Sequence, residues 1–140
     1  MVSDDARPQS AFGRTVPAVA ENVAPLRHGI VELAQSAGAS EPVRTDLALA
    51  VGEACANVVV HAYPPGDVGP LIVHAELRDG EIIIEVCDQG QGMTPRPDSP
   101  GLGLGLPLIA NLADRLEITD GPGNLGTQLM MAFSLARDPS

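Results

Sequence analysis

Hydrophobic side chains recur at helical spacing through the first part of the chain. Over the range Val19 to Ser36 they lie three or four positions apart, which predicts a helix that ends before Gly38. A second helix is predicted from an N-cap at Ser40, with Pro42 in its first turn, to about Tyr63. The apolar positions that these two helices turn toward a core are Val23, Leu26, Ile30, Leu33, Ala34, Leu47, Val51, Ala54, Val58 and Ala62.

Apolar and polar positions alternate with period two in later segments, as they do in half-buried strands. Strands are predicted over Leu71–Leu77 and Glu81–Cys87, and the Asp79-Gly80 pair between them is typical of a tight hairpin. A long loop follows from Asp88 to about Gly103. The remaining predicted elements are a helix from about Leu104 to Ala113 and two strands, Arg115–Thr119 and Gln128–Leu135.

The order of these elements predicts the fold class. Helices and strands are segregated along the chain, so we expect an α+β fold. The simplest packing is a two-layer α/β sandwich, in which a mixed, mostly antiparallel sheet carries the helices on one face. Residues 1–14 are predicted as a flexible N-terminal tail that ends in a short edge strand near Phe12 to Val16. Residues 15–137 then form a single domain, as expected for a chain of 140 residues.

The small number of cationic residues, and the absence of lysine among them, argue against several classes of protein. The formal net charge is −10, with only eight cationic Lys and Arg residues, and all eight are arginines. The absence of lysine excludes a Walker-type phosphate loop and an ordinary protein kinase, because each of these needs one. So few cations also argue against direct nucleic-acid binding, and the acidic balance favours a basic protein partner or simple solubility.

Targeting signals and cysteine chemistry are also informative. No apolar run approaches the roughly 20 residues of a membrane span. The polar segment from Met1 to Gln9 lacks the apolar stretch of a secretion signal, so we expect a cytoplasmic protein. Cys55 and Cys87 lie in apolar segments without metal-ligand spacing, and we expect them to be small core residues.

A polar line runs along the second predicted helix. Glu53, Asn57 and His61 are four residues apart, so they share one helix face. The amide oxygen of Asn57 suits Mg²⁺ beside anionic phosphates, and the Glu53 carboxylate one turn away suits a base that takes a proton from an attacking hydroxyl. Taken alone, the same line is also compatible with a solvated helix edge.

Two glycine-rich segments follow the predicted hairpin. Asp88-x-Gly90-x-Gly92, with Met93 next to it, closes a strand, where a carboxylate can accept a hydrogen bond from the exocyclic amine of adenine. A solvated turn aspartate is the alternative. The segment Gly101-Leu102-Gly103-Leu104-Gly105 opens the third predicted helix, whose free amide groups favour an anion; a flexible hinge is the alternative there.

Together these residues resemble the GHKL, or Bergerat-fold, ATP-binding superfamily over roughly Asp46 to Leu135. Glu53-x-x-x-Asn57 is similar to its N-box, and the two glycine segments are similar to its two glycine boxes. Gly126-Thr127 resembles its last motif. The stretch from Glu53 to Tyr63 is most similar to the small anti-sigma-factor serine kinases of the SpoIIAB and RsbW type, which share an Asn-Ala-x-x-His-Ala-Tyr ending, and Gly103 to Asp114 continues the likeness.

The resemblance implies the roles of individual residues. Glu53 would be the catalytic base, Asn57 the Mg²⁺ ligand, and Asp88 and Thr127 the groups that bind adenine. The second glycine box would bind phosphate. The full set implied for ATP binding is Asn57, Asp88, Gly90, Gly92, Met93, Gly101, Leu102, Gly103, Leu104, Gly105 and Thr127. The chain departs from the pattern at Leu102, where many such kinases have arginine, and Arg96 is the remaining cation of the segment between the boxes.

The function implied is an ATP- and Mg²⁺-dependent protein serine/threonine kinase. It would sequester a sigma factor, phosphorylate a serine of an STAS-type anti-anti-sigma factor, and act as a homodimer. One alternative is a non-catalytic, ATP-gated switch that binds a protein. Another is a histidine-kinase catalytic domain, which requires an upstream pair of dimerisation helices with a phospho-accepting histidine. His28 lies in the first predicted helix, with no second long helix before the ATP site.

Overall fold

The structure is a computed structural model that describes residues 11–90, 105–121, 123 and 125–136. Most predicted elements are present within a few residues of their expected bounds. In chain order they are β1 (Ala11–Pro17), the 3₁₀ turn η3 (Ala20–Asn22), α1 (Val23–Ser36), α2 (Glu41–Asn57), the π-helical turn η4 (Val58–Ala62), β2 (Pro70–Arg78), β3 (Glu81–Asp88), α3 (Leu106–Leu112), β4 (Arg115–Asp120) and β5 (Thr127–Ser134).

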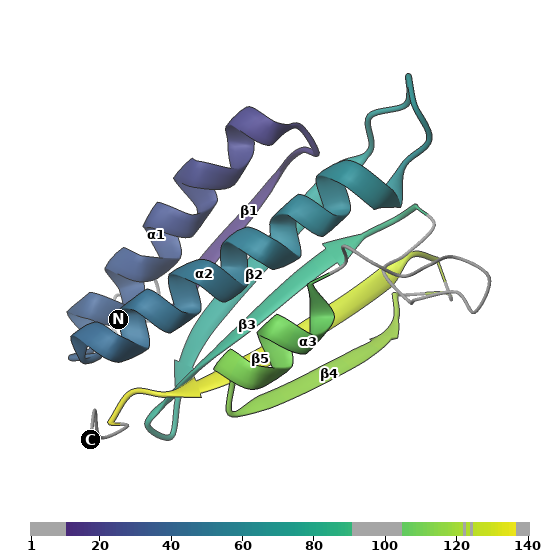
Figure 1. The fold of residues 1–140 in the computed structure, drawn as a ribbon. Coiled ribbons are helices and arrows are strands. Elements are labelled where there is room, and N and C mark those ends of the chain that lie inside the picture. Colours follow the sequence, from purple (N-terminus) through teal and green to yellow (C-terminus); the bar gives the residue numbers. More distant parts are fainter. Residues whose placement is uncertain (1–10, 91–104, 122, 124, 137–140) are drawn as a thin grey trace, which may run out of the picture.

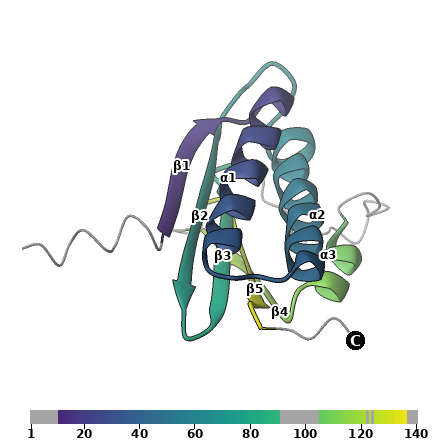
Figure 2. The ribbon, with the colours of Figure 1, turned by 90° about the vertical axis from the view of Figure 1, so that its left-hand side faces the viewer.

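The strands form one sheet, and the helices cover one of its faces. The order in the sheet is β1-β2-β3-β5-β4, so β5 lies between β3 and the edge strand β4. All pairings among the described strands are antiparallel. Figures 1 and 2 show α1, α2 and α3 on the same side of the sheet. The predicted two-layer α+β sandwich is therefore confirmed, with an antiparallel rather than a mixed sheet in the described part.

The core lies between these two layers. Along β3 every second residue is fully buried, and Ile82, Ile84 and Val86 point toward the helices. From α2, Leu47 and Val51 are likewise inaccessible to solvent. This packing confirms the apolar stripe predicted for α2, because period-two and period-3.6 patterns each bury one face of their element.

The predicted helix cap and the predicted hairpin turn are both present in the structure. The Oγ of Ser40 accepts a hydrogen bond from the Val43 amide at 3.5 Å and caps α2. Asp79 and Gly80 both have positive φ, 53° and 80°, which is the geometry of a type I′ turn between β2 and β3. These two devices fix the start of α2 and the register of the hairpin that leads to Asp88.

The chain differs from expectation at its N-terminal end. The strand expected near Phe12 to Val16 runs from Ala11 to Pro17, so it takes in residues that the predicted tail included. It pairs with β2 along its whole length. Residues 1–10 lie outside the described residues.

Replacing Leu47 with alanine tests the predicted core. The change leaves a cavity between α2 and the sheet, and we expect it to lower the free energy of unfolding by about 2–5 kcal/mol. Leu49→Ala is the matched control, because Leu49 lies two residues along the same helix and is 49% exposed. We expect that control to change stability by less than about 1 kcal/mol. Urea denaturation of both variants measures the difference, and equal losses would contradict the assignment of the core.

Candidate functional site

Three polar residues are buried among the described residues, although polar side chains usually face solvent. Asn57 is 2% exposed, Asp88 1% and Thr127 2%. Asn57 is the last residue of α2, Asp88 ends β3, and Thr127 begins β5 directly opposite Asp88. Burying such groups costs free energy unless they are paired or bind something. Their position therefore indicates a polar site where the sheet meets the end of α2.

The backbone around Asp88 is held tightly. The Oδ1 of Asp88 accepts a hydrogen bond from the Gly90 amide at 2.9 Å, which turns the chain directly after β3. Gly126 lies against the carbonyl of Asp88 so closely that a Cβ would overlap it. Gly126 also has a φ of +74°, which other residues rarely adopt. Glycine at this position is therefore required by both space and conformation.

Tyr63 connects the end of the helical segment to this turn. Its hydroxyl accepts a hydrogen bond from the Gln89 amide at 2.9 Å and donates one to the carbonyl of Pro70. Gly90 lies so close to the Ala62 carbonyl and the Tyr63 ring that no side chain fits there. Burial raises the pKa of the Tyr63 phenol. Tyr63 has no predicted role in the sequence, although it is the last residue of the stretch that resembles the Asn-Ala-x-x-His-Ala-Tyr motif.

The helix changes geometry immediately after Asn57. Val58–Ala62 form a π-helical turn, in which hydrogen bonds span five residues instead of four. The spacing of four that predicted one polar face therefore no longer relates His61 to Asn57, and His61 is exposed while Asn57 is buried. Single π-turns of this kind occur frequently at functional sites. The prediction that three polar residues share one helix face is therefore correct for Glu53 and Asn57 but wrong for His61.

The side chain of Glu53, from the C-terminal part of α2, lies against the start of α3. Its side chain packs against Gly105, where a Cβ would overlap the Glu53 carboxylate group. Gly105 has a φ of +64° and is the N-cap residue of α3, so α3 begins two residues later than predicted. Glu53 therefore lies one helical turn before Asn57 and touches the end of the second glycine segment.

The structure thus describes Glu53, Asn57, Asp88, Gly90, Gly105 and Thr127 of the predicted site. They lie at the ends of α2, β3 and β5 and at the start of α3 (Figure 1). The other predicted site residues lie outside the described residues, as does Arg96; they are Gly92, Met93, Gly101, Leu102, Gly103 and Leu104.

Neither cysteine is a candidate nucleophile. Burial raises the pKa of the Cys55 thiol to about 12. Burial, with the nearby Glu85 and Asp88 carboxylates, raises that of Cys87 to about 11. Since the thiolate is the reactive form, both side chains are inert near neutral pH. Cys55 is a buried core residue, as predicted, whereas Cys87 is only half buried.

The side chains near the site limit the kinds of metal ion that could bind there. No group of three His, Cys, Asp or Glu side chains that could hold a metal occurs in the part of the chain that the structure describes. Mg²⁺ does not need such a cage, since it commonly binds one or two protein oxygens together with phosphates and water. The amide of Asn57 fits an ion of this kind, shared between the protein and a nucleotide.

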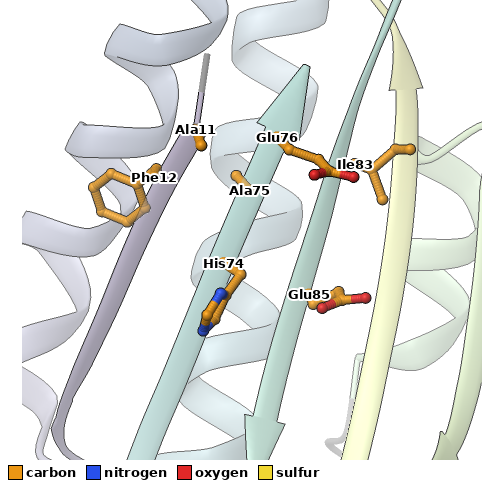
Figure 3. A pocket seen from close by; sticks show the side chains of 7 residues that line it. All are labelled: Ala11, Phe12, His74, Ala75, Glu76, Ile83 and Glu85. Atoms are coloured by element: carbon orange, nitrogen blue, oxygen red, sulfur yellow. The ribbon is translucent and has the colours of Figure 1, made fainter. Parts of the chain in front are cut away.

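A hollow on the uncovered face of the sheet contains further acidic groups. It measures about 190 Å³, and Figure 3 shows His74 and Glu76 of β2 beside Glu85 of β3. His74 and Glu85 are cross-strand partners, and Glu85 also accepts a hydrogen bond from Gln128. The hollow lies on the side of the sheet away from α2, so it is separate from the site around Asp88.

Comparison with known proteins agrees with this geometry. The model of the histidine kinase-like ATPase domain family matches residues 16–133. The chain belongs to this family. Among curated proteins, it is 35% identical to the serine-protein kinase RsbW of Halalkalibacterium halodurans, over 89% of this chain and 83% of that protein. It is 31% identical to an anti-sigma F factor of Caldanaerobacter subterraneus, over 91% of this chain and 87% of that protein.

The fold also matches a solved structure. The crystal structure of the RsbU and RsbW domains of Rv1364c from Mycobacterium tuberculosis superposes with a TM-score of 0.72 at 25% sequence identity. The match covers 91% of this chain and 33% of that longer one, so this chain corresponds to about a third of its length. The likeness confirms the predicted Bergerat-type fold.

Tyr63→Phe tests the link between α2 and the turn after β3. The ring packing remains, but the Gln89 amide loses its acceptor and the Pro70 carbonyl loses its donor. We expect a loss of about 1–3 kcal/mol in the free energy of unfolding, because the partly buried Pro70 carbonyl loses its hydrogen-bond donor. We also expect several-fold weaker MgADP binding by titration calorimetry, because the Asp88 turn is held less firmly. Unchanged stability and affinity would show that the two hydrogen bonds of Tyr63 do not hold the turn after β3.

Proposed function

We propose that the chain is an ATP-dependent protein serine kinase of the anti-sigma-factor type. The observation that carries this proposal is the position of Glu53, one turn before the buried Asn57 and in contact with Gly105. A carboxylate there is next to the phosphate-binding motifs that the family resemblance implies. Family membership and the similarity to serine-protein kinase RsbW and to anti-sigma F factors support the same activity.

The buried residues bind and orient the nucleotide in this proposal. The Asp88 carboxylate accepts a hydrogen bond from the exocyclic amine of adenine, and the Thr127 hydroxyl on the neighbouring strand contacts the same base. Asn57 offers its amide oxygen to Mg²⁺. The bound ion would neutralise charge on the phosphates. Gly90 and Gly126 let the backbone close around Asp88 without a Cβ in the way.

Glu53 acts as the base for transfer. Its carboxylate takes the proton of the acceptor serine hydroxyl as the serine oxygen bonds to the γ-phosphorus. The bond between that phosphorus and the bridging oxygen breaks, so ADP leaves and phosphoserine forms. Because the chain has no lysine, positioning depends on the metal ion, backbone amides and arginine.

The partners follow from the same proposal. The acceptor is an STAS-type anti-anti-sigma factor, and the sequestered partner is a sigma factor, with the kinase acting as a homodimer. The net charge of −10 suits a basic partner and disfavours direct DNA contact. Among the described residues, no helix is both long enough and apolar enough to cross a membrane. We propose a cytoplasmic location, where sigma factors act.

Removing the two polar groups tests nucleotide binding. We expect Asp88→Ala to weaken MgATP binding about 10-fold to 100-fold, since hydrogen bonds to charged groups contribute about 1.5–3 kcal/mol. We expect Asn57→Ala to abolish the Mg²⁺-dependent part of the affinity. Asp67→Ala, in the exposed loop before β2, is the matched control. Titration calorimetry gives the affinities, and a wild-type value in either site variant would refute that residue's role.

Glu53→Gln tests the base. Glutamine keeps the packing against Gly105 but cannot accept a proton, so we expect ATP affinity to persist while transfer falls about 10²-fold or more. The measurement is transfer of label from [γ-³²P]ATP to STAS-domain proteins of the same genome. Glu117→Gln, an exposed glutamate on β4, is the control. Transfer at the wild-type rate in Glu53→Gln would place the base elsewhere, and ATP binding without any transfer by wild type would favour a non-catalytic switch.

A further inference from the structure

The side chain of Glu53 is confined by packing rather than by polar contacts. Within the described ranges, no hydrogen bond or ion pair holds this side chain. It packs against Gly105, where a Cβ would lie 2.6 Å from the Glu53 Cδ atom. A glutamate side chain has several rotatable bonds, so its carboxylate takes a single position only where its surroundings restrict it. The position of Gly105 therefore decides where the proposed base lies.

Gly105 is joined to the far end of α3 by consecutive helical hydrogen bonds. Its carbonyl accepts one from the Ile109 amide at 3.0 Å, and the Ile109 carbonyl accepts one from the Ala113 amide at 2.9 Å. The helix has seven residues, of which Ile109 is fully buried, and so short a helix is not stable alone. Figures 1 and 2 show α3 beside α2. Its position therefore depends on the contacts that hold its ends.

Asp114 attaches the C-terminal end of α3 to β5. Its amide donates a hydrogen bond to the Ala132 carbonyl at 2.9 Å, and its Oδ2 atom accepts one from the Ser134 amide at 2.7 Å. The pairing of β4 with β5 begins at Arg115, opposite Ala132, so Ser134 lies beyond the paired part of β4. The Asp114 carboxylate thus takes the place of the backbone carbonyl that a longer β4 would offer to Ser134.

The strand that holds Asp114 also carries part of the proposed adenine site. Thr127 begins β5 opposite Asp88, and Ser134 ends it. Between these ends Leu129 and Phe133 are inaccessible to solvent, and β5 lies inside the sheet between β3 and β4. Buried internal strands are among the most stable parts of a domain. One end of β5 therefore faces the proposed nucleotide, and the other end holds α3.

We propose that Asp114 is a positioning residue for phosphoryl transfer. Its two hydrogen bonds to β5 fix α3, and α3 holds Gly105 against the side chain of Glu53. The base is thereby kept in a constant position relative to Thr127 and the nucleotide, because both depend on the same strand. The inference rests on the proposed role of Glu53. It adds a residue at the opposite end of β5 from Thr127, which acts through α3.

Asp114→Ala tests the proposal. The change removes the acceptor of the Ser134 amide, and because Asp114 is exposed we expect urea denaturation to show a folded variant. Transfer is measured from [γ-³²P]ATP to the STAS-domain protein that wild type phosphorylates. We expect kcat to fall at least about 10-fold, because a small displacement of a catalytic group slows the reaction strongly. We expect the MgATP affinity by titration calorimetry to change less than about 3-fold, since the loss belongs to the transition state.

Two further variants provide the rescue and the matched control. Asp114→Asn keeps an oxygen that can accept the hydrogen bond from Ser134, so we expect it to restore most of the wild-type kcat. Glu81→Ala removes an exposed ion pair with Arg115 at the same end of the sheet, but Glu81 lies on β3 and not on α3. We expect this control to keep the wild-type kcat.

A double-mutant cycle with Glu53→Gln shows whether Asp114 acts through the base. If Asp114 places the Glu53 carboxylate, Asp114→Ala lowers kcat in the wild-type background but leaves the residual kcat of Glu53→Gln unchanged. A purely structural role lowers kcat by the same factor in both backgrounds.

Three results would overturn the proposal. The first is a wild-type kcat in Asp114→Ala. The second is a loss of MgATP affinity as large as the loss of kcat, which would show that α3 acts on the nucleotide and not on the base. The third is an equal loss of kcat in the wild-type and Glu53→Gln backgrounds. Failure of the proposed function looks different, because wild type then labels none of the STAS-domain proteins, and the role of Asp114 fails with it.

Discussion

Close approach of three backbone segments around Asp88 is the constraint on which the site depends. Gly90 lies against the carbonyl of Ala62, and Gly126 lies against the carbonyl of Asp88. Neither approach leaves room for a Cβ, so glycine at each position lets the end of η4, the end of β3 and the start of β5 meet. The hydrogen bonds of Tyr63 to Gln89 and Pro70 then hold that meeting point in place.

The burial of polar side chains at this point costs stability, and it therefore indicates a functional role rather than a structural one. Asn57, Asp88 and Thr127 are the polar residues that the described core buries, and apolar residues there would cost less to desolvate. The protein also interrupts α2 with a π-turn directly after Asn57. Such departures from regular, apolar packing are expected where a structure must present chemical groups. In this chain they coincide with the motifs that the family resemblance assigned to ATP.

The sequence predicted what short-range patterns determine. The Ser40 cap, the Asp79-Gly80 hairpin and the buried stripe of α2 all follow from residues a few positions apart, and all are present. The Tyr63–Gln89 hydrogen bond spans 26 positions, and the Glu53–Gly105 contact joins residues on different helices, so no local pattern predicts either. The π-turn also has no sequence signal of its own. The prediction from a spacing of four residues therefore put His61 on the same helix face as Asn57, which is wrong. Thr127 was predicted from the family resemblance, and the β3–β5 register places it opposite Asp88.

In the proposed function, the site around Asp88 and Asn57 selects an adenine nucleotide and holds it through Mg²⁺. Titration calorimetry of the wild-type chain with ATP and with GTP, each in the presence of Mg²⁺ and then of EDTA, tests it directly. We predict that ATP binds, that EDTA weakens its binding, and that GTP does not bind at the same concentration, because guanine has no exocyclic amine in the position where adenine offers one to Asp88. Equal binding of the two nucleotides, or no binding of ATP, would contradict it.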